Sequence, residues 1–234
     1  SGDEMELSKR LNWILNIMDK GDVIMDVGTD HGYIAIELIK RNLADKVIAS
    51  DINKDPLNKA KLNVSLEGLS NKIELRLGGG LTPAKENEVN GVLIAGMGGN
   101  LIRDILENDI KKVKNMDYLV LQPAQNPEVL REYLYISDYE IIDEDVCFDE
   151  GKYYEVFKVK YKENNSTKLE NIFYEVSPML LNKKSDVFKD YLYEKIDKYK
   201  KVKSFIKDNT EHALSRKKEL DSKIEIIENL LKKF

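Results

Sequence analysis

Asp26-Val-Gly-Thr-Asp-His-Gly32 is the stretch that decides the fold of this chain. It follows the apolar run Val23-Ile-Met25 and precedes the amphipathic segment Tyr33-Ile-Ala-Ile-Glu-Leu-Ile39. This order is typical of a buried strand, a glycine-containing turn and a helix, which together bring helix-start N–H groups close to a nucleotide-type ligand. The sequence therefore predicts a ligand site directly after the first strand.

Two carboxylates distinguish this turn from a dinucleotide-binding turn. The dinucleotide motif G-x-G-x-x-G offers bare amides to a pyrophosphate, whereas here Asp30 replaces the middle glycine and Asp26 ends the strand. Negative charge at both positions disfavours a pyrophosphate and favours a cationic ligand. S-adenosylmethionine (SAM) carries an ammonium and a sulfonium group and has no phosphate. The alternative is that Asp30 caps the helix and that nothing binds.

Strand-like and helix-like segments alternate through the first 136 residues. Apolar runs typical of strands lie at 23–27, 46–50, 73–77, 91–95 and 118–121. Helical patterns lie at about 7–18, 31–41, 56–67, 98–108 and 127–136. This alternation predicts an α/β fold of the Rossmann-like kind, with a parallel sheet and helices on both faces.

The pattern changes after this region. Segments 139–148 and 152–161 are both extended, and Asp149-Glu-Gly151 between them has turn chemistry. They predict an antiparallel β-hairpin. An ordinary dinucleotide-binding fold would continue with parallel strands instead.

The last part of the chain is expected to be helical. The polar stretch 162–167 suggests a boundary, which gives domains 1–161 and 162–234. One long helix is predicted over 185–206, and Thr210 is a suitable N-cap for a second. Both helices carry one apolar stripe, so we expect an antiparallel coiled-coil hairpin.

Composition limits the class of protein. The 234 residues are 42% apolar and 34% charged, as in a globular protein. A single cysteine, Cys147, excludes an internal disulfide and a cysteine zinc cluster, and neither histidine has metal-ligand spacing to a partner, so no metal is expected. No apolar run approaches the ~20 residues of a membrane span, and no signal peptide is recognisable. We expect a cytoplasmic protein with no membrane contact.

Charge is divided unevenly along the chain. Residues 1–161 hold 20 Lys and Arg against 29 Asp and Glu, whereas residues 162–234 hold 17 against 13. A basic C-terminal part on an acidic body suggests a polyanionic partner. An ordinary solvated helical surface is the alternative explanation.

Further candidate residues follow the other predicted strands. Asp51 ends the second strand, where a carboxylate can accept both ribose hydroxyls of an adenosine. The glycines of Leu77-Gly-Gly-Gly-Leu81 leave room for an adenine ring. His31 contacts substrate, acts as a base, caps the helix or packs in a neutral form. The predicted cofactor-binding residues are Asp26, Gly28, Thr29, Asp30, His31, Gly32, Asp51, Ile52, Gly78, Gly79, Gly96 and Met97.

The turn Ala95-Gly-Met-Gly-Gly-Asn100 follows the fourth strand, and Gln122-Pro123 closes the fifth. Ligands of parallel sheets bind at the carboxyl ends of the strands. Three glycines in four positions would keep this place open for a planar substrate beside a methyl donor. A plain strand-to-helix turn is the alternative. The predicted substrate-binding residues are Arg10, Gly98, Gly99, Gln122 and Pro123.

The chain resembles the bacterial tRNA (adenine-22-N1)-methyltransferase family over nearly its whole length. The motifs that carry the resemblance are Leu7-Ser-Lys-Arg-Leu11, Asp26–Gly32, Ile94-Ala-Gly-Met-Gly-Gly99, Leu121-Gln-Pro123, Leu130-Arg-Glu-Tyr-Leu134 and Gly151-Lys-Tyr-Tyr-Glu-Val156. The resemblance implies a class I methyltransferase sheet, a C-terminal coiled coil, SAM as cofactor and methylation of adenine N1 in the tRNA D-arm region. Neutral N1 has a lone pair and needs no base, so no catalytic residue is assigned.

The resemblance also implies tRNA contacts, with Arg10 as a candidate for phosphate. The lysines that would hold RNA backbone are Lys183, Lys184, Lys189, Lys195, Lys198, Lys200, Lys201, Lys203 and Lys207. We expect a monomer. Three other functions stay open: a small-molecule methyltransferase with a dimerising coiled coil, a nicotinamide-dependent oxidoreductase and a non-catalytic SAM- and RNA-binding protein.

Overall fold

The computed structural model describes residues 8–234, so Leu7, where the first helix was predicted to start, lies outside the described part. The chain divides into two units, Ser1–Leu169 and Glu170–Phe234. The polar stretch 162–167 belongs to the first unit. The Thr167 N–H donates to the carbonyl of Tyr135 over 2.7 Å, and the Asn165 side-chain amide donates to the carbonyl of Tyr139 over 2.7 Å.

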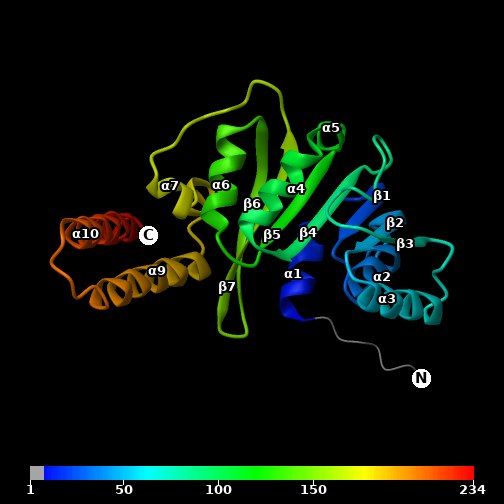
Figure 1. Cartoon of the computed structure of the whole chain (residues 1–234), viewed down its shortest axis with the longest axis horizontal. Helices are drawn as coiled ribbons and strands as arrows, with labels where there is room; N and C mark the ends of the chain where they lie inside the picture. Colours follow the sequence, from blue (N-terminus) through cyan, green and yellow to red (C-terminus); the bar gives the residue numbers. More distant parts are fainter. Residues whose placement is uncertain (1–7) are drawn as a thin grey trace. The chain divides into compact units, whose positions relative to one another are not determined.

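The described part of the first unit contains one seven-stranded sheet in the order β3-β2-β1-β4-β5-β7-β6 (Figure 1). The first five strands run parallel, and β6 and β7 form an antiparallel hairpin that pairs with β5 through β7. The predicted Rossmann-like sheet ending in a hairpin is confirmed. The strands are β1 (Gly21–Val27), β2 (Ala44–Asp51), β3 (Ile73–Leu77), β4 (Gly91–Met97), β5 (Tyr118–Pro123), β6 (Tyr139–Asp149) and β7 (Lys152–Tyr161).

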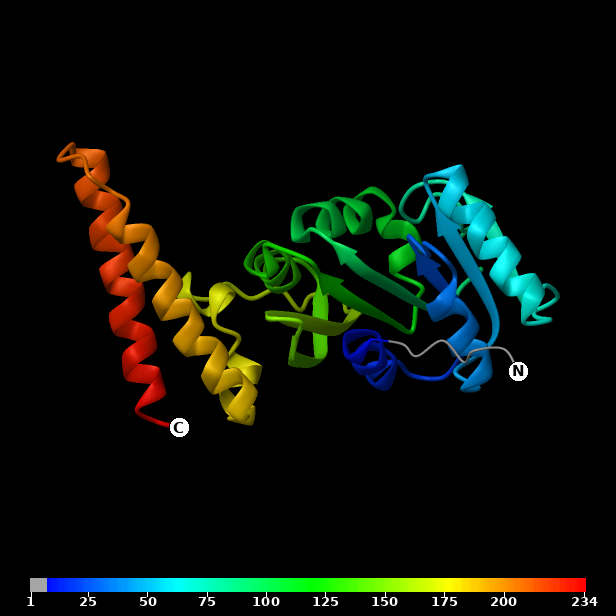
Figure 2. The same ribbon diagram turned by 90° about the horizontal axis from the view of Figure 1, so that it is seen from below.

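Helices cover both faces of the sheet, with α1 on one face and α4 and α6 on the other (Figure 2). The predicted helices all form, but a four-residue helix, α5, was not predicted. The helices of this unit are α1 (Lys9–Ile17), α2 (Tyr33–Lys40), α3 (Lys54–Leu66), α4 (Gly99–Asn108), α5 (Ile110–Val113) and α6 (Pro127–Ile136).

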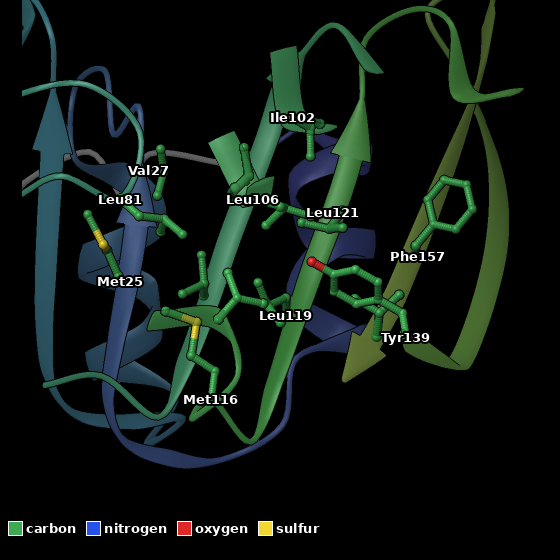
Figure 3. Packing of buried hydrophobic residues seen from close by; sticks show 14 of the residues in the cluster. Met25, Val27, Leu81, Ile102, Leu106, Met116, Leu119, Leu121, Tyr139 and Phe157 are labelled. Atoms are coloured by element: carbon green, nitrogen blue, oxygen red, sulfur yellow. The ribbon is translucent and has the colours of Figure 1, made fainter. Parts of the chain in front are cut away.

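Two apolar layers hold this arrangement, one on each face. Ile24, Val47 and Val120 point from the strands towards α1, α2 and α3. Leu119 and Leu121 lie on the opposite face with Ile102 and Leu106 of α4, as Figure 3 shows, and Leu130 and Leu134 of α6 belong to the same cluster. Because side chains alternate along a strand and both faces are covered, the central strands are apolar throughout.

A buried ion cluster joins α6 to the hairpin. The Arg131 guanidinium donates to Oε1 of Glu144 over 2.8 Å and to Oε1 of Glu155, and all three side chains are buried. Arg131 also lies over the Phe157 ring, 4.7 Å from its centroid. Two motifs of the family resemblance, around Arg131 and Glu155, therefore meet in the interior rather than at a site.

The second unit is helical, and the predicted antiparallel coiled-coil hairpin is present as α9 (Asp186–Ser204) and α10 (Glu211–Leu231). Thr210 caps α10 as predicted, since its hydroxyl oxygen accepts from the Ala213 N–H over 3.1 Å. Two short helices that the sequence did not predict, α7 (Ile172–Glu175) and α8 (Pro178–Lys183), precede the hairpin.

Candidate active site

The turn after β1 is shaped by Gly28, which has a φ of +70°. A Cβ at this residue would also lie 2.8 Å from Cε of Met97. Glycine adopts positive φ without the steric cost that other residues meet, and here it also leaves space for the Met97 side chain. The turn of β1 and the turn of β4 are therefore packed against one another at the carboxyl edge of the sheet.

Asp26 is buried at the base of this turn. The Thr29 hydroxyl donates to Asp26 Oδ2 over 2.8 Å. Burial raises the pKa of Asp26 from 3.8 to about 7, the Thr29 hydrogen bond opposes this shift, and the charge of Asp51 adds to it. A cation placed beside this carboxyl would reverse the effect of burial and favour the carboxylate.

Asp51 is held in one orientation at the end of β2. Its Oδ2 accepts from the Asp30 N–H over 3.2 Å and its Oδ1 accepts from the Asn53 N–H over 2.9 Å. Each carboxylate oxygen has a second lone pair for a further donor. These two hydrogen bonds hold the Asp51 carboxylate beside the turn of β1, where its oxygens can accept from a ligand.

A cavity of about 520 Å³ opens beside these turns. Six of the twelve predicted cofactor-binding residues line it: Gly28, Asp51, Ile52, Gly78, Gly79 and Met97. The other lining residues were not in the predicted set, although the motif that supplied Gly78 and Gly79 also contains Gly80; they are Val27, Gly80, Leu81, Thr82, Leu101, Asp104, Ile105, Asn108 and Asp109.

Much of the unpredicted lining comes from one face of α4. Leu101, Ile105 and Asn108 are spaced by four and three residues, so they share a side of that helix. Leu101 is half exposed although it is a large apolar residue. The helical spacing was visible in the sequence, but nothing there separated the face towards the cavity from the face towards the core.

The lining fits SAM on three grounds. The volume is within the ~300–1,000 Å³ typical of small-molecule sites. Asp51 offers carboxylate oxygens to ribose hydroxyls, and the side chains of Ile52, Leu101 and Ile105 form apolar walls for a flat base. The acidic side chains of the lining would repel a phosphate group, so the lining suits a ligand that has none.

The remaining six predicted cofactor residues lie outside this lining. Asp26 and Thr29 are buried, and Gly32 is the N-cap residue of α2. No side chain caps α2, so the alternative that Asp30 caps this helix is wrong. The ring of His31 lies 5.6 Å from that of Tyr33, and its Nδ1 lies 3.6 Å from Asp30 Oδ2. Gly96 has open space where a Cβ would stand.

The second half of the Gly-rich turn has a packing role. A Cβ on Gly99 would lie 2.1 Å from the carbonyl oxygen of Asn126, and the Gly99 N–H donates to the carbonyl of Gln125 over 2.8 Å. A Cβ on Gly98 would lie 3.3 Å from Nε2 of Gln125. These two glycines dock α4 against the loop after β5, whereas the sequence had assigned them to open space for a substrate.

The predicted substrate residues of α1 and β5 meet in the structure. The Arg10 guanidinium donates to Oε1 of Gln122 over 2.6 Å and lies over the Tyr154 ring, 5.2 Å from its centroid. The Gln122 amide in turn donates to the carbonyl of Pro123 over 2.6 Å. Pro123 pairs with Met97, which lines the cavity, so this group of side chains adjoins it at the same edge of the sheet.

Residues 8–234 contain neither a metal-binding cluster nor a membrane-spanning helix. No group of three or more His, Cys, Asp or Glu side chains among them is arranged to hold a metal ion. None of the helices in this part of the chain has the length and apolar character needed to span a membrane.

Comparison with known proteins identifies the family. The model of the TrmK family, tRNA (adenine(22)-N(1))-methyltransferase, matches residues 24–229. The tRNA (adenine(22)-N(1))-methyltransferase of Bacillus subtilis (strain 168) is 31% identical over 98% of each chain. The similarity extends to structure: the crystal structure of B. subtilis TrmK superposes with a TM-score of 0.86 at 31% identity, over 97% of this chain and 100% of that one.

A second solved structure bears on the cofactor. M. capricolum TrmK in complex with its cofactor product, S-adenosylhomocysteine, superposes with a TM-score of 0.82 at 27% identity, over 97% of this chain and 100% of that one. Because each of these two structures covers 97% of this chain, the shared part includes both the sheet and the C-terminal hairpin. The chain belongs to the TrmK family of tRNA (adenine(22)-N(1))-methyltransferases.

Proposed function

We propose that this protein transfers the methyl group of SAM to N1 of adenine 22 in tRNA. The observation that carries the proposal is the cavity at the carboxyl edge of the sheet, with the aligned Asp51 carboxylate at one side and the turn of β4 at the other. Membership of the TrmK family supports both the cofactor and the substrate.

Binding of the cofactor is proposed to depend on two acidic residues. Asp51 would accept the ribose hydroxyls with the lone pairs that the Asp30 and Asn53 N–H groups leave free. Asp26 and Thr29 lie under the turn of β1 and would favour the cationic part of the ligand through the buried carboxylate. Bound SAM supplies an electrophilic methyl group on a sulfonium.

The substrate adenine needs positioning more than acid–base help. Its neutral N1 has a lone pair directed along the Watson–Crick edge, so no residue has to remove a proton before attack. The enzyme then gains rate by holding two reactants in line. The base must first leave any pairing or stacking, which costs a few kcal/mol. Arg10, Gln122 and Pro123 are the residues proposed to receive it.

The C-terminal unit is proposed to hold the tRNA, because B. subtilis TrmK shares it and because basic residues outnumber acidic ones in this part of the chain. A protein of this function acts where tRNA matures, so we also propose a cytoplasmic location. We further propose that the enzyme is a monomer. Each lysine contact would add to affinity and to its dependence on salt.

The test is methyl transfer from radiolabelled SAM to unmodified tRNA, followed by mapping of the labelled nucleoside. We expect 1-methyladenosine at position 22 and no label on a tRNA in which this adenine is replaced. Label that persists on the replaced tRNA would reject the position. Tight binding of SAM and tRNA without turnover would instead support a non-catalytic binding protein.

A further inference from the structure

Positive charge in the C-terminal unit is concentrated at one end of its helical hairpin. We define the hairpin tip as residues 198–218, which comprise the end of α9, the connecting turn and the start of α10 (Figure 2). The hairpin tip holds eight Lys and Arg against two Asp and Glu, whereas the rest of 170–234 holds seven against ten. The basic excess of the unit therefore lies entirely in the tip, on a chain whose net charge is −5.

Much of this charge has no internal partner. Lys203 pairs with Asp221 over 2.6 Å, and Lys200 comes only within 4.0 Å of Glu228. Within residues 8–234, four other tip lysines form no ion pair: Lys201, Lys207, Lys217 and Lys218. Like charges at this density repel one another, so they favour a bound polyanion.

A groove of about 510 Å³ lies between the two helices at the tip. Its polar lining is Lys200, Lys203, Lys217, Ser204 and one carboxylate, Asp221, and its apolar lining is Ile206 and Ile224. Three ammonium groups against one carboxylate leave the groove with an excess of positive charge, which favours a phosphate backbone over a small neutral ligand.

Apolar side chains beside the groove face solvent. Phe205 at the end of α9 is 70% exposed, and Leu214 in the first turn of α10 is half exposed. The same hairpin buries its apolar stripe elsewhere, through Leu192, Ile196 and Leu220. An exposed aromatic ring within a basic surface is the arrangement that binds single-stranded RNA, since bases stack on the ring while cations hold the phosphates.

We propose that the hairpin tip is an RNA contact at which Phe205 stacks on an unpaired base of the tRNA substrate while the groove lysines hold the adjacent phosphates. This inference rests on the proposed function, and it names the part of the C-terminal unit that meets the tRNA. It removes Lys183, Lys184, Lys189 and Lys195, which lie outside the tip, from the main contact surface.

The experiment compares full-length variants for tRNA binding, methyl transfer and SAM binding. Phe205→Ser is expected to raise Kd and KM for tRNA at least about fivefold, in keeping with the loss of one stacked base. Its kcat at saturating tRNA and its SAM affinity should stay unchanged. Phe205→Tyr keeps the ring and should bind like the original chain. Tyr193→Ser is the matched control, because Tyr193 is a half-exposed aromatic of α9 outside the tip.

The lysines give an independent readout. Replacing the groove lysines Lys200 and Lys217 by Gln should lower the slope of log Kd against log salt by about one for each phosphate that the variant no longer binds. Replacing Lys232 and Lys233, at the other end of the hairpin, should leave the slope unchanged. Circular dichroism of each variant checks that the hairpin is still helical.

Two results would overturn the inference. One is equal tRNA affinity for Phe205→Ser and the original chain. The other is a dimer in sedimentation that Phe205→Ser dissociates, since the exposed ring would then cover a second copy of the chain. Failure of the proposed function looks different: the original chain would bind tRNA through the tip without methylating it.

Discussion

The Arg10 guanidinium donates a 2.6 Å hydrogen bond to the side-chain oxygen of Gln122, and this contact joins the start of α1 to the end of β5. The same guanidinium covers the Tyr154 ring, so three elements meet where the substrate is proposed to enter. No carboxylate of residues 8–234 pairs with the Arg10 guanidinium, which leaves its charge free to act on a phosphate.

Arg10→Ala should lower kcat/KM for tRNA about tenfold, because a hydrogen bond to a charged group contributes ~1.5–3 kcal/mol. Arg10→Lys should recover little of this, since an ammonium cannot bond to Gln122 and cover the Tyr154 ring together. SAM affinity, measured by calorimetry, should not change. Lys20→Ala, an exposed position before β1 and so at the opposite edge of the sheet, is the control, and an equal loss there would show a general charge effect.

Asp51→Asn should weaken SAM binding by about tenfold or more. The substitution removes the charge and puts an amide NH₂ against one of the two N–H groups that Asp51 now accepts from. Asp55→Asn, an exposed acidic residue in the first turn of α3, is the matched control. Calorimetric titration with SAM measures both. Unchanged affinity in Asp51→Asn would remove this residue from the cofactor site.

Asp26 should make the stability of the ligand-free protein fall as the pH rises. Its pKa is raised from 3.8 to about 7 in the folded state, so the folded protein binds the proton more tightly than the unfolded chain does. The free energy of unfolding should therefore drop between about pH 4 and pH 7, by an amount on the order of 4 kcal/mol at 1.36 kcal/mol per pH unit.

Urea unfolding of the ligand-free protein and of Asp26→Asn at pH 5 and pH 8 measures this contribution. The Asn variant should lose less stability over the same range, because its side chain cannot ionise. A cationic ligand favours the carboxylate, so SAM affinity should also increase through pH 7 in the original chain and stay level in the variant. Parallel pH profiles for the two proteins would contradict this account of Asp26.

Arg131→Met should destabilise the fold by ~3–5 kcal/mol, because it leaves two carboxylates buried without their cation. Adding Glu144→Gln and Glu155→Gln removes those charges and should restore part of the loss. Thermal unfolding of the single and triple variants gives the comparison. If the triple variant is no more stable than Arg131→Met, the buried charge is not the cause.

The strands and the longer helices were predictable from the sequence because each has a strong local pattern. Five apolar runs, each followed by a turn, indicated the parallel strands, and the Thr210 cap indicated the start of α10. The helices α5, α7 and α8 have four to six residues, too few to show a helical period, and were missed for that reason.

The candidate site was predictable only where it depends on the ends of strands. Asp51 and Gly79 line the cavity because they lie at the carboxyl ends of β2 and β3. Leu101 and Ile105 were missed because a helix pattern does not tell which apolar side chain the tertiary structure leaves uncovered. Gly99 was assigned to the wrong physical role for the same reason: its close contact is with Asn126, 27 residues further along the chain.

The position of β6 at the edge of the sheet has a consequence for how molecules of this protein behave in a crowded solution. An edge strand offers unpaired backbone groups to any other strand, which is a route to aggregation. In β6, the register shifts between Ile141 and Asp143, and Glu140, Asp143 and Asp145 place carboxylates along the strand. Irregular backbone and repelling charges thus protect the outermost strand from fibril-like growth.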